Sequence, residues 1–476
     1  MPNLPSRDEL LALLQAHGQE HVLRFWDELD ATGRAQLAGQ LQAIDWENFD
    51  GWVKEYVLDP KPVALPANVK PAPHYPLTPR NAAEAVLYEG AGRRGEALLQ
   101  AGRVAAFTVA GGQGTRLGYD GPKGSLPISP VKNKTLFQLF AESLARAQEK
   151  YRTVIPWYIL TSPINDGPTR DFFKANGFFG LDPKRVRFFI QGTMPAIGLD
   201  GKLLLQAKDS LALSPNGHGG SLLALQQSGA LKEMADRRID HISYWQVDNP
   251  LVQMFDPLFL GLHDLCNSDL SSRGLVKTGP FEKLGNYCLV NGKVTIIEYS
   301  DMPEDLAKSK GPDGRLRFRV GSPAIHIIRR DFVERLTEGG RLKLPFHRAV
   351  KKVPCLDEAG APVTPAEANA VKLEMFIFDA LPLAGKPVIL EADRAEQFGP
   401  VKNASGIDSV DSSRKLQQER AAVWLEAAGI RIPRQADGSL DCTLELSPRR
   451  YLDRADVVAA KDAFTAPESG TQAYFE

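Results

Sequence analysis

A run of strand-forming residues meets a glycine-rich turn in VAAFTVAGGQGTRLGYDGPKGSLPIS, residues 104–129. The six residues 104–109 lead directly into glycines, and two cations, Arg116 and Lys123, follow close behind. In α/β proteins, a glycine-rich turn after a strand presents backbone N–H groups to a phosphate. The stretch therefore predicts a phosphate-handling loop at the carboxyl end of a buried strand.

Neither of the two most familiar phosphate loops matches this stretch. The dinucleotide pattern G-x-G-x-x-G, started at Gly112, needs a third glycine where Leu117 stands. A P-loop needs Gly-Lys-Ser/Thr, whereas residues 123–125 read Lys-Gly-Ser. A plain tight turn with solvated charges is the structural alternative. The glycines nevertheless leave a wall without side chains, against which a base or phosphate could approach the backbone.

The bulk composition is typical of a globular chain of two or three domains. The 476 residues are 43% hydrophobic and 24% charged, and the net charge of −1 argues against a nucleic-acid partner. The four cysteines form no C-x-x-C pair, which favours reduced thiols over a zinc site. We see no signal-peptide core and no run of about 20 apolar residues. We expect a cytoplasmic protein without a membrane partner.

Three consecutive regions are expected along the chain. Residues 1–101 read as a helical region, with a Ser6–Glu9 capping box and a proline-rich connector over residues 58–79. Residues 102–385 form a central α/β domain, and residues 386–476 form a small C-terminal domain that begins with a strand.

The central region alternates strands and helices. Strands are predicted at 104–109, 157–161, 186–190 and 241–247, with helices at 135–150, at 168–176 and from 221. Asn291-Gly292 predicts a hairpin within residues 286–300. The pattern predicts a Rossmann-like, mostly parallel sheet with helices on both faces. The glycine loop and Asp248 both follow a strand, so we expect them to open onto one crevice.

The motifs taken together resemble those of the UDP-sugar pyrophosphorylases, especially the eukaryotic-type UDP-N-acetylglucosamine pyrophosphorylases. Beside the glycine loop, the resemblance includes GQEHVLRFWDEL, FFIQGTMPAIGLDGKLLL, SPNGHGG, WQVDNPLV and EADRAEQFGPVKNA, and it covers nearly the whole chain. It implies a GT-A-like nucleotidyltransferase fold. The implied reaction joins UTP to a sugar 1-phosphate with Mg²⁺, or with Mn²⁺ as the alternative, and releases pyrophosphate.

The resemblance implies roles for four charged residues. Arg116 matches the arginine that holds the β- and γ-phosphates, and Lys123 matches the lysine at the α-phosphate and the sugar phosphate. Lys402 matches a lysine that reaches the phosphates from the C-terminal side, and Asp248 matches the magnesium ligand. The alternative is that each cation is a solvated surface charge and that Asp248 only terminates a strand.

The resemblance also implies the residues that would contact the nucleotide. Gly111 and Gly112 match the positions whose backbone lies against uracil. Gln191 offers an amide with both a donor and an acceptor, as a uracil edge requires, and Gly217 would bring backbone against the nucleotide.

Sugar recognition is implied at Gly285, Glu298 and Ser322, together with His218. His218 and Ser322 stand where the N-acetylglucosamine branch has asparagine, which favours the glucose or broad-range branches. The glycine loop itself favours the N-acetylglucosamine branch. The segment FHRAVKKVP, residues 346–354, also resembles a family segment, but we expect it to be a solvated basic helix face.

Three functions remain open at this point. The first is an N-acetylglucosamine 1-phosphate uridylyltransferase, and the second is a glucose or broad-range UDP-sugar enzyme. The third is a non-catalytic UDP-sugar-binding protein, which would not need the cations expected at the leaving group. The sequence gives no prediction of the oligomeric state.

Overall fold

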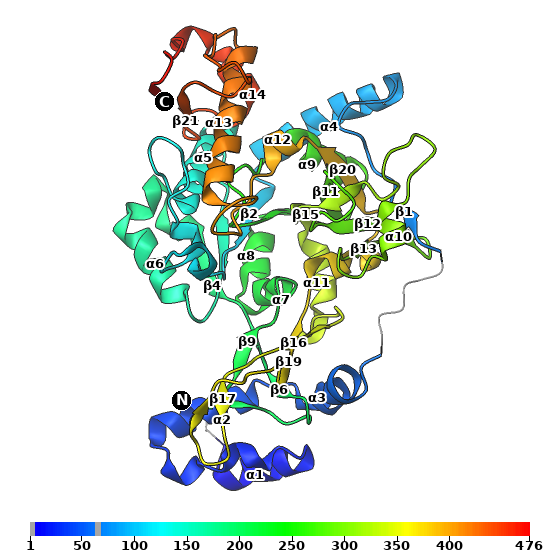
Figure 1. The fold of residues 1–476 in the computed structure, drawn as a ribbon, viewed down its shortest axis with the longest axis vertical. Helices are drawn as coiled ribbons and strands as arrows, with labels where there is room; N and C mark the ends of the chain where they lie inside the picture. Colours follow the sequence, from blue (N-terminus) through cyan, green and yellow to red (C-terminus); the bar gives the residue numbers. More distant parts are fainter. Residues whose placement is uncertain (1–4, 62–67) are drawn as a thin grey trace. The chain divides into compact units, whose positions relative to one another are not determined.

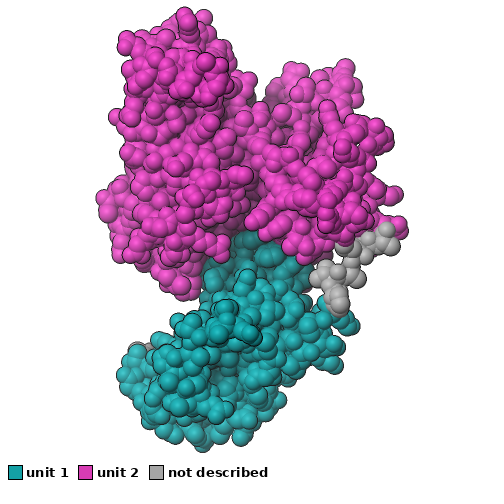
Figure 2. Space-filling view, viewed as in Figure 1, with its two compact units in different colours: residues 1–65, 191–221, 344–377 teal, residues 66–190, 222–343, 378–476 magenta. Residues whose placement is uncertain are grey.

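The computed structural model describes residues 5–61 and 68–476, which form two compact units (Figure 2). Unit 1 contains residues 1–65, 191–221 and 344–377, and unit 2 contains residues 66–190, 222–343 and 378–476. This grouping differs from the three consecutive regions expected, because segments far apart in the chain pack together in each unit. Residues 62–67 of the expected connector lie outside the described residues.

Unit 2 is built on an eleven-stranded sheet (Figure 1). Four strands of this sheet run parallel in the order β4-β3-β2-β10. They are β2 (Val104–Val109), β3 (Trp157–Thr161), β4 (Val186–Ile190) and β10 (His241–Gln246). The chain adds β3 and β4 on one side of β2 and β10 on the other. The sheet therefore has a topological switch point between β2 and β10, where α/β proteins bind ligands.

Most of the other strand pairs in this sheet are antiparallel, so the prediction of a mostly parallel sheet is wrong. The strands that pair antiparallel are β1 (Lys70–Pro71), β11 (Leu270–Val276), β12 (Gly285–Val290), β13 (Lys293–Ile297), β14 (Val320–Ser322) and β15 (His326–Arg329). The strand–helix alternation stops after α9 (Pro257–Leu265), and loops and hairpins then join the strands. The predicted hairpin is confirmed, since Asn291 and Gly292 both have positive φ.

Helices cover both faces of the parallel half. On one face, Phe140 of α5 (Leu136–Tyr151) packs edge-on against Trp245, with ring centroids 5.6 Å apart. On the other face, Glu233 of α8 (Ala230–Asp236) accepts a 2.8 Å hydrogen bond from Arg187 of β4. All six residues of β2 are buried as a result.

The helix α4 (Ala82–Gln100) packs closely on α9 in unit 2. A Cβ at Gly95 would lie 1.8 Å from the Pro257 carbonyl oxygen, so this crossing requires a glycine. The strand β20 (Val388–Ala392), which begins the expected C-terminal domain, pairs in parallel with β11 of the large sheet. The chain after it forms a small core of its own between α13 (Val410–Ala427) and the pair β21 (Thr443–Leu446) and β22 (Gln472–Phe475).

Unit 1 combines the N-terminal helices with short strands. The helices α1 (Arg7–Ala16), α2 (Ala31–Gln42) and α3 (Trp46–Trp52) bury a shared apolar core. The predicted capping box is confirmed, because Ser6 and Glu9 exchange hydrogen bonds at the start of α1. None of the helices that the structure describes is long and apolar enough to cross a bilayer.

The expected basic helix face at residues 346–354 is wrong. Residues His347–Lys351 form strand β16, which pairs antiparallel with β19 (Ala370–Glu374), and β6 (Ile197–Gly198) completes that sheet. In this register Val350 lies opposite Val371, so a pairing partner from a distant segment sets the structure.

Candidate functional site

The glycine loop of unit 2, residues 110–126, is held in place by backbone groups and by one buried amide. The Lys123 N–H donates to the Gly112 carbonyl oxygen over 3.1 Å, which folds the loop back on itself. Asn165, which is fully buried, donates from Nδ2 to the carbonyl oxygens of Ala110 at 2.9 Å and Gly112 at 3.3 Å. Asn165 was not predicted from the sequence, and the loop owes its position to it.

The glycines of the loop differ in what surrounds them. A Cβ at Gly114 would lie 2.7 Å from the Tyr119 ring, and one at Gly124 would lie 2.1 Å from the Phe137 ring. A Cβ at Gly112 would meet nothing within 4 Å. The packing inside the loop therefore explains why residues 114 and 124 are glycines. Gly112 is exposed and leaves an open stretch of backbone beside Gly111.

A chain of contacts brings three predicted residues together at the carboxyl ends of β2 and β10. Lys123 Nζ donates to the Val401 carbonyl oxygen over 3.4 Å, and the Val401 N–H donates to the Asp248 carbonyl oxygen over 2.9 Å. Lys402 is the next residue in the chain. Arg116 lies on the same glycine loop with an exposed side chain. Lys123, Asp248 and Lys402 therefore lie near one another in unit 2.

Asn249 holds this arrangement in place, and its role was not predicted from the sequence. Its buried side chain donates from Nδ2 to the Gln397 carbonyl oxygen over 2.8 Å and accepts from the Gly399 N–H over 3.0 Å. These two bonds hold the segment before Val401 against the end of β10. A buried polar group that makes several hydrogen bonds is costly to remove, so the position of Lys402 is well specified.

Two carboxylates of unit 2 lie near Lys402. The Lys402 N–H donates to the Asp408 carbonyl oxygen over 2.6 Å. Burial raises the pKa of the Asp408 carboxyl, the positive charge of Lys402 opposes this, and the negative charge of Asp248 adds to it. Asp408 was not predicted as a site residue.

The donor set at Asp248 fits a hard cation that shares its ligands with a substrate. Within residues 5–61 and 68–476 no cluster of three or more His, Cys, Asp or Glu side chains could hold a metal ion. Mg²⁺ commonly takes only one or two carboxylates and completes its shell with phosphate oxygens and water. Asp248, with Asp408 in its vicinity, offers that kind of partial site.

The three residues predicted to contact the sugar in unit 2 lie together. Gly285 of β12 is paired with Ser322 of β14, and a Cβ at Gly285 would lie 3.2 Å from Glu298 Oε1. Tyr287, two residues along the same strand, donates from its hydroxyl to the Arg273 carbonyl oxygen over 2.9 Å. Burial raises the pKa of Tyr287 to about 12, and a hydrogen bond with the Ser322 side chain opposes that rise.

In unit 1 the structure brings Gln191 and Gly217 together. Gln191 is 7% exposed and donates from Nε2 to the Gly217 carbonyl oxygen over 2.7 Å. Gly217 has a φ of +83°, and a Cβ there would lie 2.3 Å from the Met375 carbonyl oxygen. The turn 214–220 therefore requires glycine at this position for its own conformation.

His218 follows in the same turn and is held in one tautomer. Its Nδ1 accepts a hydrogen bond from the Ile377 N–H over 3.2 Å, and its ring stacks on Phe376 with centroids 5.1 Å apart. Burial, with a smaller effect of His347, lowers the pKa of His218 to about 4. The ring is therefore neutral at pH 7 and carries its hydrogen on Nε2. His347 stacks on Phe376 as well, with centroids 4.3 Å apart.

A phosphate-type loop at the switch point of a partly parallel sheet defines an α/β nucleotide-binding protein. A family model described as UTP–glucose-1-phosphate uridylyltransferase matches residues 76–426. The chain belongs to this family, the UDP-sugar pyrophosphorylases, which are nucleotidyltransferases. The prediction of this family from the motifs is confirmed.

Individual relatives and a solved structure show in more detail which proteins this chain is similar to. Over 431 residues the chain is 36% identical to the human UDP-N-acetylhexosamine pyrophosphorylase-like protein 1, covering 87% of this chain and 84% of that protein. It is 37% identical to the UDP-N-acetylglucosamine pyrophosphorylase of Saccharomyces cerevisiae, covering 71% and 72%. A putative UDP-N-acetylglucosamine pyrophosphorylase from Entamoeba histolytica superposes with a TM-score of 0.73 at 28% identity, over 86% of this chain and 99% of that one.

Proposed function

We propose that the chain is a uridylyltransferase that converts UTP and N-acetylglucosamine 1-phosphate into UDP-N-acetylglucosamine and pyrophosphate. One observation carries the proposal: the contacts from Lys123 Nζ through Val401 to Asp248, which gather two cations and a carboxylate at the switch point. The printed names of the human and yeast relatives support the choice of sugar.

The residues suit an in-line transfer of the uridylyl group. A phosphate oxygen of the sugar phosphate attacks the α-phosphorus of UTP, and the bond to the bridging oxygen of pyrophosphate breaks on the opposite side. Both substrates are polyanions, so catalysis consists mainly of positioning and charge neutralisation. In our proposal Lys123 and Lys402 neutralise the α-phosphate and the incoming phosphate, while Arg116 holds the departing pyrophosphate.

The open backbone at Gly112 suits a planar uracil ring. A side chain at that position would project into the space that the base needs, whereas the present backbone leaves it clear. We propose that Gly111 and Gly112 lie against the base and that Gln191 and Gly217 contact the nucleotide.

We further propose that Asp248 holds a Mg²⁺ ion, with Mn²⁺ as an alternative and with Asp408 as a second candidate ligand. An ion held by Asp248 would supply positive charge beside the phosphates of the nucleotide. The role of Asp248 would be to hold the metal ion beside the cationic side chains of the glycine loop.

For the sugar, we propose that Gly285, Glu298, Ser322 and His218 contact the hexose. Glucose 1-phosphate is the second candidate substrate, and the observation that favours it is the tautomer of His218. A neutral Nε2–H donor suits a hydroxyl or phosphate oxygen, and it stands where the N-acetylglucosamine branch carries an amide.

Two finer features are part of the proposal. We propose that the sheet of unit 2 is the GT-A-like version of the nucleotidyltransferase fold, which the parallel order β4-β3-β2-β10 supports. We also propose a cytoplasmic location, since the four cysteines are free thiols in the structure.

The direct test is pyrophosphate release from UTP with a panel of sugar 1-phosphates. We expect release with N-acetylglucosamine 1-phosphate, loss of release with a chelator and recovery with added Mg²⁺. Asp248→Asn should lower both the apparent affinity for Mg²⁺ and the turnover, because an amide oxygen is a poorer ligand for a hard dication. Asp171→Asn on the exposed side of α6 (Asp166–Ala175) is the matched control. Binding of UDP-sugars without release from any sugar phosphate would favour the non-catalytic protein instead.

A further inference from the structure

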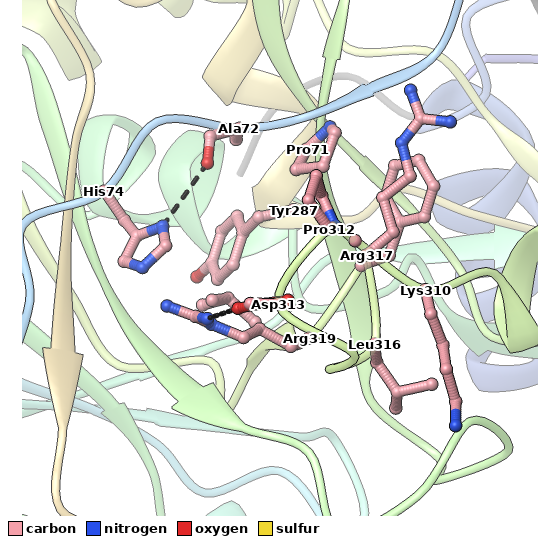
Figure 3. A pocket seen from close by; sticks show the side chains of 13 residues that line it. Pro71, Ala72, His74, Tyr287, Lys310, Pro312, Asp313, Leu316, Arg317 and Arg319 are labelled. Atoms are coloured by element: carbon pink, nitrogen blue, oxygen red, sulfur yellow. Dashed lines mark hydrogen bonds and ion pairs between the residues drawn. The ribbon is translucent and has the colours of Figure 1, made fainter.

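Unit 2 contains a cavity with a volume of about 520 Å³, and no residue of the glycine loop lines it (Figure 3). Its walls come from residues 71–74, from Tyr287 of β12 and from residues 310–320. The apolar part of the lining consists of Pro71, Ala72, Tyr287, Leu316, Phe318 and Val320. A volume of this size with mostly apolar walls and a few polar groups is typical of a small-molecule site.

The aromatic wall of this cavity is rigid. Tyr287 is 2% exposed, and its hydroxyl is held by the Arg273 carbonyl oxygen at 2.9 Å. The Ala72 N–H donates to the Tyr287 carbonyl oxygen over 3.2 Å, which ties the segment 71–74 to the same strand. These buried groups therefore support the cavity from behind, and a ligand would find it already formed, without a further ordering cost.

Positive charge dominates the polar part of the lining. Arg319 is the most enclosed cation, and its nearest carboxylate is Asp313, with 3.5 Å between Nη1 and Oδ2. Figure 3 shows the Arg319 guanidinium on the same side of the cavity as His74 and Tyr287. The cations Lys310 and Arg317 belong to the same loop, and within the described part of the chain neither has a carboxylate within 4.0 Å.

Asp313 and Glu391 do not cancel this charge. Asp313 is more than half exposed, and Glu391 lies 3.6 Å from His74 Nε2 rather than beside an arginine of the cavity. Burial lowers the pKa of His74, so its ring is mostly neutral at pH 7 and can act as a hydrogen-bond donor or acceptor. The lining thus contains three cations and one carboxylate.

We propose that this cavity binds a small molecule that carries an anionic group and a flat apolar part, with Arg319 as the main partner of the anion. A guanidinium whose only carboxylate contact is long keeps donors for a phosphate or carboxylate group, and its planar fork suits two oxygens at once. The apolar part of the ligand packs on Pro71 and Leu316, the apolar lining residues that are not buried. The proposal goes beyond the uridylyltransferase reaction and does not rest on it.

The test is calorimetric titration of the full chain with phenyl phosphate, inorganic phosphate and phenol. Phenyl phosphate should bind more tightly than either fragment. Arg319→Gln should weaken its binding at least 10-fold. Arg315→Gln, on the same loop but outside the lining, should leave it unchanged. The exposed pair Lys310→Gln and Arg317→Gln should weaken it a few-fold without affecting folding, which keeps the test informative if Arg319→Gln is unstable.

Three results would overturn the proposal. The first is equal binding of phenyl phosphate by the parent and Arg319→Gln, or no binding by either. The second is the same loss in Arg315→Gln, which would indicate a general charge effect. The third is loss of binding in the double variant Arg116→Gln and Lys123→Gln, which would put the probe at the glycine loop. Equal affinity for inorganic phosphate and phenyl phosphate would contradict the role of the apolar lining.

Discussion

The glycine loop of unit 2, residues 110–126, and the glycine turn of unit 1, residues 214–220, look alike in sequence and differ in structure. In the turn, a Cβ at Gly217 or Gly219 would meet backbone atoms within 2.8 Å, and one at Gly220 would meet Asn216 at 2.1 Å. In the loop, the space beside Gly112 is open. The number of glycines therefore says little about where a ligand approaches, and the space around each missing Cβ says more.

The two regions also differ in charge. The loop carries Arg116 and Lys123, whereas the turn carries His218, whose pKa of about 4 leaves it neutral at pH 7. Under the proposed function, the loop would neutralise the charge on the phosphates, and the turn would act through neutral hydrogen bonds. Each of the following variants tests one side of this comparison.

The largest effect is expected from the cations of the loop. Lys123→Ala and Arg116→Ala should each lower turnover by ~100-fold, about 3 kcal/mol, because each side chain acts on charge that moves or leaves in the transition state. Steady-state pyrophosphate release measures this, and Lys184→Ala, an exposed lysine after α6, is the control. Near-parental turnover in a folded Lys123→Ala protein would show that Lys123 of the loop does not take part in catalysis.

The next effect concerns stability in the turn. Gly217→Ala should destabilise unit 1 by roughly 2–3 kcal/mol, since its φ of +83° is strained for alanine and the Cβ would overlap the Met375 backbone. Gly18→Ala has a similar φ of +64° but no atom nearer than 3.7 Å, so it isolates the cost of the dihedral. The apparent melting temperature should fall clearly further for Gly217→Ala. Equal losses would mean that the close packing of the turn contributes little.

The parallel half of the sheet could be predicted closely from the sequence. The ranges of β2, β3 and β4 match the predicted strands residue by residue, because each is a short apolar run bounded by turns. The antiparallel half and β16 could not be predicted in the same way. Their pairing depends on partners far along the chain, as Val350 opposite Val371 illustrates, and local periodicity does not encode such partners.

The candidate site shows the same contrast between residues in local motifs and residues whose role depends on distant partners. The cations and Asp248 were predicted from motifs that resemble those of the family, and their roles stay predictions. Asn165 and Asn249 could not, because a loop asparagine that pins backbone carbonyls looks the same in sequence as a solvated one. Their role depends on burial and on carbonyl groups that only the folded chain brings within reach.

A smaller effect is expected at the open position of the loop. Gly112→Ala should raise KM for UTP by about 10-fold, or about 1.4 kcal/mol, with little change in stability, because its Cβ meets no protein atom but enters the space proposed for uracil. Gly124→Ala should do the reverse and cost roughly 1–3 kcal/mol of stability, because its Cβ overlaps the Phe137 ring. Parental UTP binding by Gly112→Ala would show that the base lies elsewhere.

The smallest effect is expected at His218, and it bears on the choice of sugar. His218→Asn restores the amide of the N-acetylglucosamine branch and should shift the kcat/KM ratio of N-acetylglucosamine 1-phosphate to glucose 1-phosphate upward by about 5-fold, the worth of one net hydrogen bond. Ser322→Asn, the second departure from that branch, should shift the ratio in the same direction. Use of glucose 1-phosphate alone by the parent would contradict the proposed substrate.

The pH dependence gives His218 a second and independent readout. Its pKa is lowered to about 4 in the folded chain from an ordinary value of 6.5, so the unfolded chain binds the extra proton first as the pH falls. The folded state is therefore destabilised progressively between pH 6.5 and pH 4, and this part of the acid sensitivity should disappear in His218→Asn. Above pH 6.5 the ring is neutral in both states, so the sugar ratio should stay constant from pH 7 to pH 8. A ratio that changes with pH within that interval would mean that another group discriminates between the two sugars. An unchanged ratio in His218→Asn would mean that the neutral Nε2–H donor does not contact the sugar.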